Sequence, residues 1–302
     1  MFEDINNFNI LAFDGGGIRG AISISILNMI QEHYPSILDK MSLIGGTSTG
    51  SFIAIGIAYG LTPKEILNIY TGDGGKQVLG KNSPGIIMSK YETDDLRNLL
   101  LTIFPKDLRL KDLSKFVVIP AFYLGENGDK WEPIFYNNLP GSDNENSRVI
   151  DVMLASSAAP IYFPIYNNHV DGGIIANDPS LVCLIHALDC GLAKSISNIK
   201  LISIGTGDLN KKISIEKSNW GAIDWIINKE VSYPIINLIL ESNSKFSQYC
   251  IKKILDENYI RINPSIEKNI SLDDIKFIKE LVKIGESYSI EKELEWIGQN
   301  WN

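Results

Sequence analysis

Three glycine-rich segments hold the residues whose types and spacing suit chemistry. They are Asp14-Gly15-Gly16-Gly17-Ile18-Arg19-Gly20, Gly46-Thr47-Ser48-Thr49-Gly50 and Asp171-Gly172-Gly173. Each follows an apolar run that predicts a strand. Because ligands of α/β proteins bind at the carboxyl ends of the strands, we take these three segments as the candidate site.

The second segment has the pattern Gly-x-Ser-x-Gly between an apolar strand and an apolar helix. In that setting the serine occupies a strained, exposed turn, and the flanking Gly46 and Gly50 let two backbones pass closely. The N-terminus of the following helix favours a negative charge nearby. Ser48 is therefore the candidate nucleophile. The alternative for such a short pattern is a polar connector, and the strand and helix around it favour the functional interpretation.

The first segment fits two kinds of site. Gly15, Gly17 and Gly20 match the dinucleotide fingerprint G-x-G-x-x-G, but the following strand, 42–44, lacks the acidic residue at its end that would bind the ribose. Three consecutive glycines at a helix start also offer unobstructed backbone N–H groups, the material of an oxyanion hole. Arg19 adds positive charge there, or else is an ordinary solvated or ion-paired side chain.

A serine nucleophile needs a base, and the chain has three histidines. His33 lies at the far end of its helix and His186 lies in mid-helix, as structural histidines do. His169 precedes Asp171 by two positions, so both side chains face one side of an extended segment. Asp171 itself is either a carboxylate of the site or an ordinary turn residue. Turn chemistry alone favours the ordinary turn residue.

The composition excludes several classes of protein. The chain has 302 residues, 44% apolar and 21% charged, as in ordinary globular proteins. Its net charge of −8 disfavours binding to a nucleic acid polymer. Zinc and calcium motifs are lacking, and 73–75 is interpreted as a flexible turn. Cys183, Cys190 and Cys250 lack a CxxC spacing and are predicted to be buried thiols.

The sequence also bears on location. The N-terminal residues lack the basic and apolar regions of a signal peptide. Two uncharged stretches, 41–63 and 152–170, hold glycines or prolines that suit buried turns better than a membrane span. We expect a cytoplasmic protein that is peripheral at membranes when active, with export by a signal-independent route left open.

Strands and helices alternate along the chain. Apolar runs predict strands at 8–13, 42–44, 116–122, 131–136 and 200–204, and helical patterns cover 21–33, 49–59 and 180–191. Capping signals start further helices at Thr62-Pro63 and Thr93. The segments 219–250 and 271–296 are predicted to be mostly helical. This alternation predicts a parallel or mixed sheet covered on both faces.

Taken together, the three glycine-rich segments resemble the motifs of the patatin-like phospholipase family. The order and spacing of the oxyanion block 14–20, the nucleophile elbow 46–50 and the aspartate motif 171–173 agree with that family. The segments 155–160 with Tyr162-Phe163, Asn177-Asp178-Pro179, and 202–207 also look like family blocks. The resemblance covers roughly residues 9–208.

The resemblance implies a three-layer α/β/α fold with a mostly parallel central sheet and a helical C-terminal part. It implies one catalytic domain over 1–302, with the motifs in 9–208 and a helix-rich part in 209–302. It also implies a Ser-Asp dyad, in which Ser48 attacks the acyl carbonyl and Asp171 accepts the proton. The oxyanion hole implied is Gly15, Gly16 and Gly17 with Arg19, and the motif-supporting residues are Asp14, Gly20, Gly46, Gly50, Gly172 and Gly173.

The implied activity is hydrolysis of acyl ester bonds in phospholipids or related membrane lipids, without a cofactor or metal. The expected partners are the lipid and, transiently, a membrane surface. The segment 71–89 is a candidate lid, and 220–240 is either a lipid-facing surface or a core helix. The alternative function is a nucleotide-binding or catalytically silent regulatory module that uses Gly15–Gly20. An activating ligand or protein and the oligomeric state stay open.

Overall fold

The computed structural model describes residues 7–80, 85, 88–210, 213, 218–228 and 231–301. Its centre is a seven-stranded sheet in the order β4-β3-β2-β1-β6-β8, with β5 paired to β3. The strands are β1 (Phe8–Phe13), β2 (Leu43–Gly46), β3 (Phe116–Tyr123), β4 (Glu132–Asn137), β5 (His169–Asp171), β6 (Ile199–Ile204) and β8 (Tyr259–Ile262). Only β4 and β5 run antiparallel to their described neighbour β3, so the prediction of a mostly parallel sheet is confirmed.

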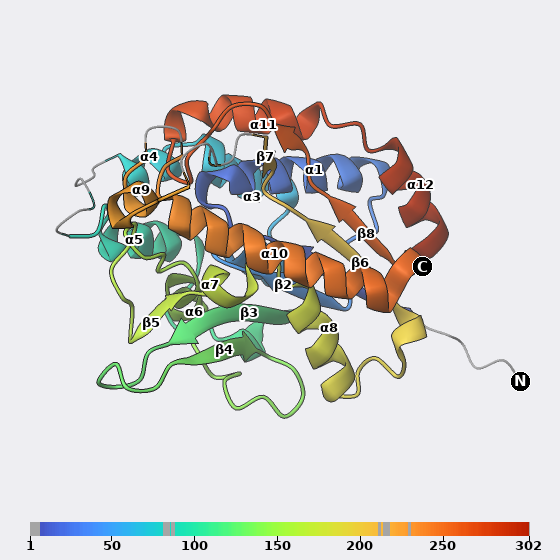
Figure 1. The fold of residues 1–302 in the computed structure, drawn as a ribbon. Coiled ribbons are helices and arrows are strands. Elements are labelled where there is room, and N and C mark those ends of the chain that lie inside the picture. Colours follow the sequence, from blue (N-terminus) through green and yellow to red (C-terminus); the bar gives the residue numbers. More distant parts are fainter. Residues whose placement is uncertain are drawn as a thin grey trace, which may run out of the picture.

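Helices cover both faces of this sheet (Figure 1). Side chains alternate along each strand, so that in β1 Leu11 joins one core cluster and Ile10 the other. The first face is covered by α1 (Gly20–His33), α2 (Thr49–Tyr59) and α11 (Ile278–Glu286). The second face is covered by α8 (Ser180–Asp189) and α10 (Pro234–Leu255). The three-layer α/β/α architecture is thus confirmed.

The remaining helices and strands connect these layers. Thr62 caps α3 as its sequence predicts, because its hydroxyl accepts a hydrogen bond from the Glu65 N–H. The remaining elements are α3 (Pro63–Thr71), α4 (Gly74–Leu79), α5 (Thr93–Ile103), α6 (Val149–Ser156), α7 (Gly173–Ala176), α9 (Ala222–Ile226) and α12 (Glu291–Asn300), with the small pair β7 (Asp208–Leu209) and β9 (Ser265–Ile266).

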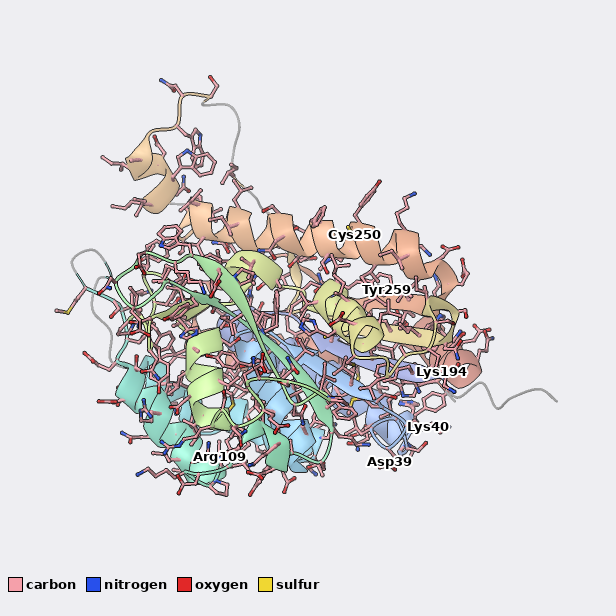
Figure 2. All side chains as sticks on the ribbon, turned by 90° about the horizontal axis from the view of Figure 1, so that it is seen from below. Asp39, Lys40, Arg109, Lys194, Cys250 and Tyr259 are labelled. Atoms are coloured by element: carbon pink, nitrogen blue, oxygen red, sulfur yellow. The ribbon has the colours of Figure 1, made fainter. Side chains whose placement is uncertain are left out.

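Some local expectations are wrong. The segment 73–75 begins α4 instead of forming a flexible turn. The strand β5 lies where an extended segment before Gly172 is expected, whereas the helix α6 and the strand β8 are additions, each too short for hydrophobic periodicity to identify. Of the cysteines only Cys183 is buried, whereas Cys190 and Cys250 are partly exposed. Figure 2 places Cys250 on the surface helix α10, which has solvent on its outer side.

Within the described residues, every helix is too short or too polar to cross a bilayer. After residue 208, the described strand β8 and the helices α10 and α11 join the same layers as the rest. The strand β8 extends the central sheet beside β6, and Trp301 donates its indole N–H to the Ile37 carbonyl at 2.9 Å. The helices α1 and α11 lie in contact along the first face, where Gly285 fits against Ile22.

A buried ion cluster joins strand ends at the carboxyl edge of the sheet. Arg261 of β8 donates both terminal amino groups to Asp14, which follows β1, at 2.7 and 2.5 Å. The same guanidinium donates to the Ser203 hydroxyl of β6 at 2.6 Å and lies 3.4 Å from Asp178. Asp14 and Asp178 are both almost fully buried. This one guanidinium therefore holds the start of the glycine-rich segment 14–20.

Removing Arg261 should destabilise the fold strongly. We expect Arg261→Met to lower the free energy of unfolding by about 3–5 kcal/mol, because it leaves Asp14 buried without its counter-charge. The control is Arg148→Met, since Arg148 forms an exposed pair with Asp107 at 3.7 Å. That variant should cost less than about 1 kcal/mol. Urea denaturation measures both, and equal small losses would contradict the structural role of Arg261.

Candidate active site

The Ser48 turn joins β2 to α2 in a strained conformation. Ser48 has φ +52° and ψ −119°, in a region that residues with a side chain rarely adopt. Its N–H donates to the Ser156 hydroxyl at 3.0 Å. The hydroxyl of Ser156, at the end of α6, therefore helps to hold the strained backbone.

The two glycines around Ser48 are required by close backbone contacts. A Cβ on Gly50 would lie 2.3 Å from the Phe13 carbonyl oxygen at the end of β1. A Cβ on Gly46 would lie 2.1 Å from the Gly50 carbonyl oxygen. The turn thus passes directly against the end of β1, and this contact brings Ser48 next to the glycine loop 14–20.

Asp171 reaches Ser48 from the end of β5. Its buried carboxylate accepts a hydrogen bond from the Ser48 hydroxyl and another from the Gly173 N–H at 2.6 Å. Burial raises the pKa of Asp171 to about 6, although both hydrogen bonds act to lower it. A carboxylate with this pKa is ionised at neutral pH and is a stronger base than an exposed aspartate.

The glycine loop presents two backbone donors to the same place. Gly16 and Gly17 line the cavity that contains Ser48, and neither N–H has an acceptor within the described part of the chain. The Gly15 N–H, in contrast, donates to the Asn177 carbonyl at 2.9 Å. The expectation that Gly15 is an oxyanion donor is therefore corrected, because its N–H already has a partner inside the protein.

Arg19 also lies elsewhere than the sequence predicts. Its Nε donates to the Gly16 carbonyl at 3.4 Å, so it contacts the loop from behind. The side chain lines a second cavity and not the one that contains Ser48. The expectation that Arg19 forms part of the oxyanion hole is therefore corrected, because its side chain contacts the loop through the Gly16 carbonyl and does not enter the cavity of Ser48.

Ser48 and Asp171 open into a cavity of about 350 Å³. Apart from these two residues and the glycine loop, its walls are mainly aliphatic and aromatic side chains. They include Phe52, Ile66, Val78, Leu96, Leu100, Phe104, Phe163, Ile236, Ile239 and Leu240. An apolar lining beside a glycine loop does not suit the phosphates of a dinucleotide, so the geometry disfavours the fingerprint interpretation of Gly15–Gly20.

None of the three histidines lines this cavity. Both ring nitrogens of His169 have partners elsewhere, the Tyr136 hydroxyl at 3.0 Å and the Asn167 carbonyl at 2.5 Å. His33 and His186 each contact a carbonyl of their own helix. Among the described residues, no cluster of three or more metal-ligating side chains occurs either.

Residues outside the motifs hold the site together. The Asn243 side chain of α10 donates to the Gly173 carbonyl at 2.6 Å and accepts from the Asn177 N–H at 2.7 Å. It thereby clamps the turn that follows Asp171. The sequence does not single out Asn243 or Arg261, because nothing around them in the chain marks a contact with a distant loop. Ser156 lies in the segment 155–160 that resembles a family block, but its bond to Ser48 is not visible in the sequence.

Comparison with known proteins identifies the family. A protein-family model described as Patatin-like phospholipase matches residues 11–184. Protein teg of Priestia megaterium is 29% identical over 322 residues, covering 99% of this chain and 100% of that protein. The putative sporulation hydrolase CotR of Bacillus subtilis is 28% identical over 318 residues, covering 97% and 98% of the two chains.

A solved structure supports the fold independently. VipD from Legionella pneumophila resembles this chain with a TM-score of 0.52 at 14% identity, over 98% of this chain and 67% of VipD. Fold, motif order and the family model agree. The chain therefore belongs to the patatin-like phospholipase family, and it is a lipid acyl hydrolase.

Proposed function

We propose that this enzyme cleaves acyl ester bonds of phospholipids or related membrane lipids through an acyl-Ser48 intermediate, with Asp171 as the base. The observation that carries the proposal is the hydrogen bond from the Ser48 hydroxyl to the buried Asp171 carboxylate inside an apolar cavity. This pairing activates a serine without a histidine.

In the acylation step, the Ser48 oxygen attacks the ester carbonyl carbon while its proton passes to Asp171. The tetrahedral intermediate collapses, the bond to the leaving alcohol breaks, and Asp171 returns the proton to that alcohol. In the second step a water molecule attacks the acyl-enzyme and gives its proton to Asp171. The proton then returns to Ser48 as the fatty acid leaves.

The oxyanion of each tetrahedral intermediate is placed against the N–H groups of Gly16 and Gly17. Both donors are fixed before the substrate arrives, because neighbouring peptides of the loop are hydrogen-bonded. The Ile18 N–H donates to the Leu272 carbonyl at 2.8 Å, and the Gly15 carbonyl accepts from the Thr206 hydroxyl at 3.0 Å. Prepositioned donors of this kind typically contribute about 10²- to 10³-fold each to turnover.

The cavity supports an acyl chain as the group that binds beside Ser48. Its volume of about 350 Å³ and its aliphatic lining offer burial to a long hydrocarbon chain. The helix α4 contributes Gly75, Val78 and Leu79 to this wall. The lid proposed for 71–89 therefore includes residues that contact the cavity, while 81–84 and 86–87 lie outside the described residues.

A membrane surface fits the end of the molecule that carries α9. Figure 2 shows α9 standing out from the body near the start of α10. Its Ile223 is 74% exposed, and Ile226 and Ile227 are exposed as well. The adjoining turns of α10 place Ile239 and Leu240 in the catalytic cavity. An apolar surface next to the cavity of Ser48 supports the interpretation of 220–240 as a surface that docks on lipid, and not as a core helix.

The first prediction separates the Ser-Asp dyad from other arrangements. Ser48→Ala should lower ester hydrolysis by about 10⁴-fold or more and abolish labelling by a fluorophosphonate. Asp171→Asn should come close to that level, because it keeps the shape of the side chain and removes its basicity. His169→Asn is the matched control and should retain substantial activity. An inactive His169→Asn beside an active Asp171→Asn would refute the dyad, and an unlabelled wild-type enzyme would favour a silent regulatory module.

The second prediction concerns pH. Only the ionised form of Asp171 accepts a proton, so kcat/KM should rise with pH through about 6 and level off above it. If Asp171 had the pKa of an ordinary aspartate, kcat/KM would rise at a pH of about 4. Initial rates with a soluble short-chain ester measure the profile. A rise near pH 6 that persists in the residual activity of Asp171→Asn would assign it to another group.

The third prediction concerns the lipid surface. Replacing Ile223 or Ile227 with Ser should weaken binding to phosphatidylcholine vesicles by about tenfold each, since each removes an apolar side chain from the contact. The control is Ile185→Ser, which changes an exposed isoleucine of α8, away from α9 in Figure 1. Vesicle co-sedimentation measures the binding. Equal effects of all three variants would contradict a specific surface at α9.

A further inference from the structure

A second cavity lies behind the glycine loop. The loop contributes Gly16 and Gly17 to the catalytic cavity, and it contributes Asp14 and Arg19 to the second one. The second cavity has a volume of about 120 Å³. Lys245, Arg261 and Asn263 also line it, so its walls are much more polar than those of the catalytic cavity.

Arg19 lies in this cavity without a full set of partners. The residue is only 7% exposed, and burial lowers the pKa of its guanidinium. In the part of the chain that the structure describes, the guanidinium makes one hydrogen bond, from Nε to the Gly16 carbonyl. No described carboxylate lies within ion-pair distance of it, and neither Nη group has a described acceptor. Both Nη groups can therefore donate to an acceptor from outside the chain.

The acidic groups that face Arg19 have cations of their own. Glu241 and Asp208 lie 3.6 and 3.3 Å from the Lys245 ammonium, and Asp14 is held by Arg261. Among the described cationic side chains that line the cavity, Lys245 and Arg261 are ion-paired, whereas the Arg19 guanidinium is not. The unpaired guanidinium therefore favours an anionic ligand over a cationic one.

We propose that the second cavity binds a phosphate group or a similar oxoanion through the Nη groups of Arg19. The planar guanidinium suits two oxygens of such a group, and burial strengthens the charge-assisted hydrogen bonds. Asn263 uses its side-chain oxygen for the Gly207 N–H at 2.7 Å, which leaves its amide N–H groups for the ligand. This binding goes beyond the proposed hydrolysis and is measurable without it.

The site connects to the oxyanion hole through a single residue. The Arg19 Nε donates to the carbonyl of Gly16, which shares its peptide plane with the Gly17 N–H, a proposed oxyanion donor. An anion that holds the guanidinium further restrains this peptide and hence the direction of the Gly17 N–H. The bound oxoanion is thus a candidate activator that acts from behind the loop.

The experiment titrates inorganic phosphate against the full-length protein at constant ionic strength, with chloride as the balancing anion. Isothermal calorimetry should show saturable binding to the wild type. Arg19→Gln should weaken it by about tenfold or more, since it removes charge-assisted hydrogen bonds. Arg19→Lys keeps the buried charge and so guards against loss of folding, and it should also weaken binding because it lacks the planar fork. Arg148→Gln is the control with the same charge change at the surface.

A second arm distinguishes a free phosphate from a lipid headgroup. Vesicles of phosphatidylcholine with and without phosphatidic acid are co-sedimented with the wild type and with Arg19→Gln. If Arg19→Gln weakens the binding of inorganic phosphate, the ligand of the cavity is a soluble phosphate. If it weakens only the binding of vesicles with phosphatidic acid, the ligand is a lipid headgroup. The proposal is overturned if Arg19→Gln binds both phosphate and phosphatidic acid as well as the wild type does. It is also overturned if the wild type binds phosphate no more strongly than chloride, and vesicles with phosphatidic acid no more strongly than plain vesicles.

Discussion

The close passage of the Ser48 turn against the end of β1 is the constraint on which the site depends. Any side chain at Gly50 would collide with the Phe13 carbonyl, and the strained φ of Ser48 persists because the chain on both sides is fixed. This contact sets Ser48 beside the glycine loop without a side-chain bond between them. The sheet itself thus brings together Ser48 and the N–H groups of Gly16 and Gly17, the proposed nucleophile and oxyanion donors.

The apolar cavity that is proposed to accept the acyl chain also sets the pKa of the proposed base, Asp171. Desolvation raises the pKa of Asp171, and the hydrogen bonds from Ser48 and Gly173 keep the rise small enough for the carboxylate to be ionised at neutral pH. More polar walls would lower that pKa and weaken the base. In the proposed mechanism, binding of the substrate and activation of Ser48 therefore rest on one physical property, which is the exclusion of water from this cavity.

The sequence predicts those parts of the site that backbone contacts impose. Glycines around Ser48 and after Asp171 are visible in the sequence because a side chain there would collide with a neighbouring backbone. Long-range hydrogen bonds leave no such trace. Nothing near Gly15 indicates that Asn177 accepts its N–H, and nothing near Arg19 indicates that its side chain turns away from the cavity of Ser48. The sequence predicts most of the longer strands and helices, whereas short elements such as α6 and β8 carry too little pattern.

The C-terminal part carries no recognised motif, yet it holds two of the three motifs in place, the glycine loop 14–20 and the turn after Asp171. Arg261 binds the aspartate that opens the glycine loop, and Leu272 accepts the N–H of Ile18 at the end of the three glycines. From α10, Asn243 clamps the turn after Asp171. The recognised motifs thus end near residue 208, but the parts of the chain before and after this residue are joined by many contacts. Since catalytic donors and a base must be fixed within fractions of an ångström, the proposed catalytic geometry depends on both parts of the chain together.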